Sequence, residues 1–166
     1  MKRGEDLFEC IKEFVDLDQK IISMSDVISD ITDRAERGFT IAIGSDSQKI
    51  NGKISLVTTL CAHHYRKGST AYYIKQKIDE KEFPTLRARM SLEAYSSLEL
   101  AVLIREFIPN SEKVEIHLDI GSDPKKCKTF KFKKELTSMV LAQGFACETK
   151  PKSWASSSVA DWFTKT

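Results

Sequence analysis

Residues 39–52 decide the fold, and they read FTIAIGSDSQKING. The apolar run Phe39–Gly44 has the composition of a buried strand, and it leads into the polar stretch Ser45-Asp46-Ser47-Gln48. Asn51-Gly52 is a strong signal for a two-residue hairpin turn, because both residues tolerate a positive φ. Lys53–His64 is therefore predicted to return beside the first strand as its antiparallel neighbour.

Beyond this hairpin the sequence adds one more strand and then alternates helices with strands. Gly68 marks the turn before a third strand at Thr70–Ile78, and Pro84 opens a long helix over about 84–107. The remaining predicted elements are a strand at Val114–Ile120, a helix at Thr129–Gln143, a short strand at Phe145–Thr149 and a helix over 153–164. This order predicts an α/β fold with a five-stranded mixed sheet, in which strands one, four and five are parallel.

The segment before the first strand shows helical periodicity. Apolar side chains recur on one face of a helix predicted over residues 5–16, and a second helix is predicted over 26–36. We therefore expect all 166 residues to form a single domain, with an N-terminal helical extension over 1–38 and a core over 39–166.

The composition is that of a globular protein, with 41% hydrophobic and 30% charged residues. No apolar run is long enough to cross a bilayer, and the N-terminus lacks the apolar stretch of a secretory signal. We therefore expect a cytoplasmic protein without a membrane partner. The four cysteines, Cys10, Cys61, Cys127 and Cys147, form no Cys-x-x-Cys pair, so free thiols are expected.

The net charge of +2 gives no overall signal for nucleic acid, but the charge is unevenly distributed. Between Asp123 and Lys152 there are eight lysines and three acidic residues, a local excess of five positive charges. Such a patch can hold phosphates, although a solvated face is the more ordinary explanation of a charge run.

Two aspartates fall where predicted parallel strands end. Asp46 follows strand one, and Asp119 ends strand four, which reads VEIHLD over residues 114–119. If these strands are neighbours, both carboxylates emerge at the edge of the sheet where open α/β sheets place their ligands. Strand-end aspartates also commonly cap loops, so neither residue alone identifies a site.

Two helical carboxylates can join this pair. Glu93 lies on an apolar stripe of the long helix and so points toward the sheet, where a buried charge needs a partner; Glu99 is the rival if the helix has another phase. Asp161 lies in the last helix, where a merely solvated side chain is the ordinary alternative. Carboxylates suit hard cations such as Mg²⁺, and two such ions can promote phosphodiester cleavage.

Several short motifs resemble a bacterial and phage family of ribonuclease H-like proteins, long catalogued as a domain of unknown function. The motifs are Gly44-Ser45-Asp46-Ser47-Gln48, His117-Leu118-Asp119-Ile120-Gly121, Gly144-Phe145, Lys150-Pro151 with Trp154-Ala155-Ser156, and Val159-Ala160-Asp161-Trp162-Phe163-Thr164. The resemblance spans about residues 39–166, and its C-terminal motif is the most specific part.

The resemblance implies the ribonuclease H-like fold, with the five strands in the order 3-2-1-4-5. In that superfamily two Mg²⁺ or Mn²⁺ ions bind acids that correspond here to Asp46, Glu93, Asp119 and Asp161, which would be both the metal-binding and the catalytic residues. Four acids from four separated elements at one edge predict a metal-dependent nuclease acting on RNA, an RNA–DNA hybrid or structured DNA. The chain departs from well-studied ribonucleases H in having one helix, rather than several, between strands four and five.

Four further residues are candidates for substrate contacts. Ser47 and Gln48 can contact a substrate or only bond the turn, and Lys150 can bind a phosphate near the metal edge. Trp154 can stack on a base, although packing between helix and sheet is more common. His117 is expected to be a packed histidine.

Two alternatives to a nuclease stay open. A ribonuclease H-like module without catalysis would bind nucleic acid or protein, in keeping with the modest net charge. An actin-like phosphotransferase shares the core fold, but the short chain argues against it because such ATPases need two copies of the domain.

Overall fold

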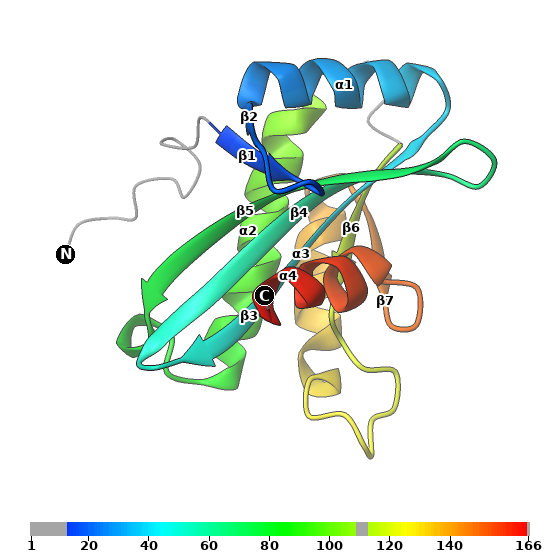
Figure 1. Ribbon diagram of the computed structural model, residues 1–166. Coiled ribbons are helices and arrows are strands. Elements are labelled where there is room, and N and C mark those ends of the chain that lie inside the picture. Colours follow the sequence, from blue (N-terminus) through cyan, green and yellow to red (C-terminus); the bar gives the residue numbers. More distant parts are fainter. Residues whose placement is uncertain (1–12, 109–112, 166) are drawn as a thin grey trace.

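A seven-stranded sheet organises the computed structural model, which describes residues 13–108 and 113–165. The strands are β1 (Glu13–Asp16), β2 (Ile21–Ser23), β3 (Thr40–Ile50), β4 (Lys53–His64), β5 (Gly68–Asp79), β6 (Val114–Leu118) and β7 (Ala146–Thr149). The α-helices are α1 (Met24–Glu36), α2 (Leu86–Arg105), α3 (Lys133–Ala142) and α4 (Asp161–Lys165). In Figure 1, α2 and α3 lie behind the sheet and α4 lies in front of it.

The order of the core strands confirms the predicted topology. The sheet order is β2-β1-β5-β4-β3-β6-β7, so the five predicted strands lie in the predicted order 3-2-1-4-5. β3, β4 and β5 are antiparallel, whereas β6 is parallel to β3 and β7 is parallel to β6. Asn51 and Gly52 turn the first hairpin with φ values of 49° and 75°, as their sequence predicts. The α/β class with a mixed sheet is thus confirmed.

The prediction of an N-terminal helical extension is wrong in part. This region contributes two strands, β1 and β2, so the sheet has seven strands rather than five. Residues 1–12 lie outside the described residues, but residues 13–16 of the predicted first helix form β1. β1 pairs with both β2 and β5, and from this strand Phe14 packs into the large apolar cluster that includes residues of α1. The second predicted helix is confirmed as α1, and Ser23 caps it by accepting a hydrogen bond from the backbone of Asp26.

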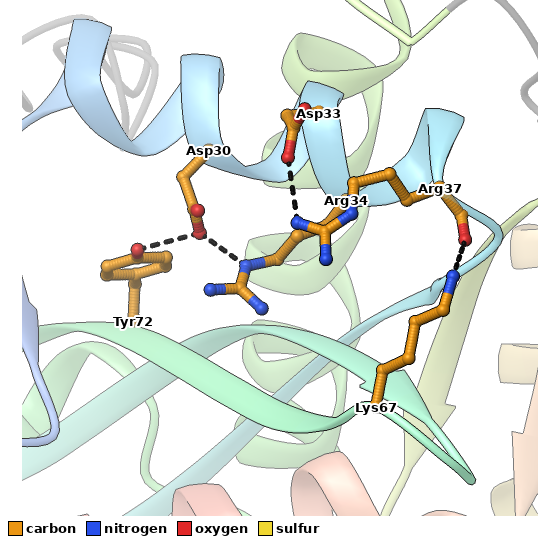
Figure 2. Close-up of polar contacts among 6 residues, drawn as sticks. All are labelled: Asp30, Asp33, Arg34, Arg37, Lys67 and Tyr72. Carbon is orange, nitrogen blue, oxygen red and sulfur yellow. Dashed lines mark hydrogen bonds and ion pairs between the residues drawn. The ribbon is translucent and has the colours of Figure 1, made fainter.

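Polar contacts tie α1 to the β4–β5 hairpin (Figure 2). Asp30 accepts hydrogen bonds from Tyr72 of β5 at 2.9 Å and from Arg34 at 2.7 Å. Lys67, in the hairpin turn, donates to the carbonyl oxygen of Arg37 at 3.1 Å. Burial, reinforced by the hydrogen bond to Asp30, raises the pKa of Tyr72 to about 12, so this hydroxyl keeps the proton that it donates.

The two faces of β3 are packed differently. Ile41 and Ile43 belong to the large apolar cluster that includes residues of α1 and α2. Ala42 and Gly44 alternate with them and face the C-terminal segment, where Ala42 packs with Ala155. A Cβ added to Gly44 would lie 2.5 Å from the backbone nitrogen of Ser156, so only glycine permits this close approach.

Short irregular helices join the main elements. The helix predicted over 153–164 consists of a π-helix, η4 (Ala155–Ala160), followed directly by α4. The 3₁₀ helices are η1 (Glu80–Glu82) and η3 (Phe130–Phe132). In the described ranges, no helix is long and apolar enough to cross a bilayer. Cys61, Cys127 and Cys147 are free thiols, and Cys10 lies outside these ranges.

Candidate functional site

The candidate site lies where β3 continues beyond the end of β6. β3 pairs with β6 only from Ile41 to Gly44, but it pairs with β4 as far as Ile50. The sequence predicted that Asp46 lies just past the end of this strand. In the structure Asp46 lies inside β3, because pairing with β4 extends the strand through the Ser-Asp-Ser-Gln stretch. Beyond Gly44 the other side of β3 has no strand partner in the described residues. Side chains from both faces of the sheet can approach each other around this free edge.

Glu93 reaches the edge from α2. Its side chain is 7% exposed, and the Ser47 hydroxyl of β3 donates a hydrogen bond to its Oε1 at 2.5 Å. Burial raises the pKa of Glu93 to about 8; the bond from Ser47 opposes this rise, and the charges of Asp46 and Asp119 add to it. The predicted glutamate of α2, Glu93, is thus bonded to β3.

Asp46 is held from the opposite face of β3, by α4. Thr164 Oγ1 donates a hydrogen bond to Asp46 Oδ2 at 2.6 Å, and it also lies 2.8 Å from the carbonyl oxygen of Asp161. Burial raises the pKa of Asp46, the bond from Thr164 opposes the rise, and the charges of Asp161 and Asp119 add to it. The four predicted acids, Asp46, Glu93, Asp119 and Asp161, therefore interact electrostatically, and together we call them the acid group.

Lysines neutralise the two acids farthest from the core. Asp119, just after β6, forms an ion pair with Lys150 at 2.5 Å, and Asp161 forms one with Lys165 at 2.6 Å. These ion pairs turn both carboxylates toward ammonium groups. Each of the four acids thus has its own partner, either a hydroxyl or an ammonium group.

The donor set suits a hard divalent cation, although the side chains do not converge on one point. In the part of the chain that the structure describes, no group of three or more His, Cys, Asp or Glu side chains is placed to hold a metal ion. Carboxylate oxygens are nevertheless the ligands that Mg²⁺ and Mn²⁺ prefer. Burial raises the pKa values of Asp46 and Glu93 and so disfavours their ionised forms, which a nearby cation would favour.

Hydroxyl groups fix α2 against the sheet beside the acids. Ser45 of β3 lies 2.9 Å from Thr58 of β4 and 2.8 Å from Ser97 of α2, measured between side-chain oxygens. Ser97 follows Glu93 by one helical turn, so the two residues lie on the same face of α2. Two neighbouring hydrogen bonds, from Ser45 and Ser47, therefore set the position of Glu93 relative to Asp46.

His117 fixes the start of the C-terminal segment. It is 1% exposed, and its Nδ1 accepts a hydrogen bond from the backbone of Ala155 at 3.1 Å. Nδ1 must then be unprotonated, so in the neutral ring Nε2 carries the proton and donates it to Glu115 at 3.2 Å. Trp154 packs edge-on against His117, with ring centroids 5.1 Å apart. The histidine is packed as expected, and it ties η4 to β6.

The structure distributes the four predicted substrate residues unevenly. Ser47 and Lys150 lie in the acid group, through Glu93 and Asp119 respectively. Gln48 is exposed on β3, and Trp154 takes the packing role that was the alternative to base stacking.

Two residues that contact the acids, Thr164 and Lys165, were not identified as site residues from the sequence. Both follow Asp161 within one helical turn, and that spacing was the available signal.

Comparisons with known proteins agree with the topology. A model of the family described as ribonuclease H-like matches residues 23–165. The uncharacterized protein YkuK of Bacillus subtilis (strain 168) is 27% identical over 175 residues, which cover 97% of this chain and 90% of that protein. No solved structure matches the chain significantly. The region matched by the family contains all four acids and their partners.

Proposed function

The chain belongs to the ribonuclease H-like family, and on that premise we propose that it is a divalent-metal-dependent nuclease. Family membership supports a nuclease-like or nucleic-acid-related role in general terms. The finer proposal is the hydrolysis of phosphodiester bonds in RNA, an RNA–DNA hybrid or structured DNA. The observation that carries it is the placement of four acids, with their hydroxyl and ammonium partners, on β3, α2, the end of β6 and α4.

Asp46, Glu93, Asp119 and Asp161 are the residues that would hold Mg²⁺ or Mn²⁺, with two ions as the proposed complement. When bound, such ions activate a water molecule and stabilise the leaving oxygen of the phosphodiester. Glu93 must lose its proton before it can act as a ligand, because burial raises its pKa to about 8.

The partners of the acids have separate roles in this proposal. Ser47 orients one oxygen of Glu93, and Thr164 orients one oxygen of Asp46. Lys150 and Lys165 balance Asp119 and Asp161 when no cation does so. Once released, their ammonium groups can donate to substrate phosphate.

A cleavage assay on end-labelled RNA, RNA–DNA hybrid and branched DNA tests the proposal. We expect cleavage by the wild-type protein with Mg²⁺ or Mn²⁺, and none with EDTA or in Asp46→Asn. Asp33→Asn is the matched control, because Asp33 is an exposed acid of α1 that pairs with Arg37. A full panel left uncut, with Asp46→Asn indistinguishable from wild type, would contradict the proposal.

A module that binds nucleic acid or protein without catalysis is the second candidate. The ion pairs of Lys150 and Lys165 favour it, because they compensate the charges of Asp119 and Asp161 without any metal. This function predicts binding that is unchanged by EDTA and by Asp46→Asn, and an anisotropy assay with the same oligonucleotides distinguishes the two candidates.

A further inference from the structure

A pocket of about 330 Å³ adjoins the acid group on the α4 side of the sheet. Four of its lining residues are lysines, contributed by β4, β5 and α4, and none of its lining residues is acidic. The lysines are Lys53, Lys75, Lys77 and Lys165. Lys53 forms an ion pair with Asp79 at 3.7 Å, and the pocket lining is basic although it lies beside the acid group.

Strand pairing places the pocket on the same face as Asp46. Asp46 lies opposite Val57, which lies opposite Lys75; Ser55 lies opposite Lys77 in the next row. Directly opposed residues in antiparallel strands point to the same face, so these rows form one surface. The row of Ser55 lies two residues, or about 7 Å, along the strands from the row of Asp46.

The pocket and the acid group share part of a wall. Thr164 lines the pocket and donates its hydrogen bond to Asp46. Lys165 also lines the pocket while it pairs with Asp161. Lys75 donates to the carbonyl oxygen of Phe163 at 3.1 Å, which holds α4 against this side of the sheet. A ligand in the pocket would therefore lie immediately beside the acids.

Ser55 supplies an independent sign of a ligand. The residue is 4% exposed, and its hydroxyl oxygen has no hydrogen-bond partner in the described parts of the chain. Leaving a buried hydroxyl unpaired is unfavourable, and an acceptor oxygen in the pocket would satisfy it. Lys77 likewise has no hydrogen bond or ion pair to a described residue, so its ammonium group can serve a ligand.

We propose that this lysine pocket binds a phosphate group of the nucleic acid on which the acid group acts. The inference rests on the proposed function. A phosphate offers several acceptor oxygens to the ammonium groups and to the Ser55 hydroxyl, and lysines hold it as point charges without reading a base. The same chemistry suits a terminal monophosphate and an internal phosphodiester.

Binding of short fluorescent oligonucleotides, with either a 5′-phosphate or a 5′-hydroxyl, tests the pocket. Anisotropy is measured in EDTA, so that no metal-dependent cleavage occurs. We expect the double variant Lys53→Gln/Lys77→Gln to bind about tenfold more weakly and to lower the salt slope by about two. Lys49→Gln is the matched control, because Lys49 lies on the same hairpin but on the opposite face of the sheet, where it donates to Pro84.

The outcomes separate the pocket from the nuclease. Weakening confined to the 5′-phosphorylated oligonucleotide identifies a terminal phosphate, and equal weakening with both ends identifies an internal one; either supports the pocket. An unchanged affinity and salt slope in the double variant would overturn it, as would a wild-type protein that binds none of the oligonucleotides. Lysine-dependent binding by a protein that cleaves nothing would refute the nuclease and keep the pocket.

Discussion

Two pairs of acids in the candidate site are held in different ways. The inner pair, Asp46 and Glu93, receives hydrogen bonds from Thr164 and Ser47, and burial raises both of its pKa values. The outer pair, Asp119 and Asp161, forms ion pairs with lysines at 2.5 and 2.6 Å. A hydroxyl orients a carboxylate without neutralising it, whereas an ammonium group does both.

This difference teaches where an external cation would gain most. Burial disfavours the ionised forms of the inner pair, so a divalent ion would stabilise these carboxylates once Glu93 has lost its proton. At the outer pair the same ion must first displace a lysine. Substitutions at the inner pair and at the outer pair are therefore expected to have effects of different kinds and sizes.

The largest expected difference is in catalysis. Asp46→Asn should lower the rate of metal-dependent cleavage on the order of 1000-fold or more, because it removes a central ligand while keeping the shape. Asp161→Asn should lower it by roughly 10- to 100-fold, because the lysine-paired acid contributes less. Single-turnover cleavage measures both rates. Equal losses in the two variants would remove the distinction between inner and outer acids.

A second substitution displaces η4 without changing an acid. Gly44→Ala would place a Cβ 2.5 Å from the Ser156 nitrogen and 2.7 Å from the Ala155 carbonyl carbon. Because these are backbone atoms, we expect a loss of about 3 kcal/mol in the free energy of unfolding. Urea denaturation gives this value, with Gly52→Asn, at an open hairpin position, as the milder control. A loss no greater than in the control would mean that η4 can move away freely.

The charge of Glu93 should appear in the pH dependence of stability. Its pKa in the folded protein, about 8, exceeds the ordinary value of 4.5, so the folded protein keeps a proton that the unfolded chain releases. The free energy of unfolding of the metal-free protein should therefore fall as the pH rises from 4.5 toward 8. Glu93→Gln cannot ionise, and it should be more stable than wild type at the upper end of this range by about 4 kcal/mol.

Denaturation in EDTA at both ends of that pH range measures this effect. Glu36→Gln, at an exposed position of α1, is the control and should retain the slope of the wild type. An unchanged slope in Glu93→Gln would show that this side chain is no source of the destabilisation.

The smallest effect concerns the outer pair. Lys150→Gln removes the cation that competes at Asp119, so the affinity for Mg²⁺ should rise about two- to fivefold, in keeping with a half-exposed ion pair. Lys152→Gln, an exposed lysine two residues away, should leave the affinity unchanged. Calorimetric titration measures both affinities. Weaker binding in Lys150→Gln would reverse the comparison, because the lysine would then support the site.

Local sequence was sufficient for the core topology but not for the ends of its strands. The Asn51-Gly52 turn and the crossover helices predict which strands are antiparallel and which are parallel, whereas the order 3-2-1-4-5 was implied by the family resemblance. β1 has only four residues, and pairing with β5 overrides their helical periodicity. Asp46 was misplaced for the same reason, since the partner strand β4 determines where β3 ends.

The acids were found from the sequence, but most of their partners were not. Strand ends and helical phase bring Asp46, Glu93 and Asp119 to one edge. The bond from Thr164 to Asp46 joins residues 118 positions apart, and no local pattern encodes such a contact. Lys165 and the lysine pocket likewise depend on how α4 lies across the sheet, which is set by Gly44 and His117.

The free edge of β3 has a consequence for association between molecules. Unpaired strand edges can recruit strands from other chains and so begin aggregation. In the described part of the chain the outer strands β2 and β7 have only three and four residues, so they offer few backbone groups. The longer free stretch of β3 carries Asp46 and Lys49, and charged side chains on an edge discourage a further strand. The sheet can thus open an edge to a ligand without offering it to a fibril.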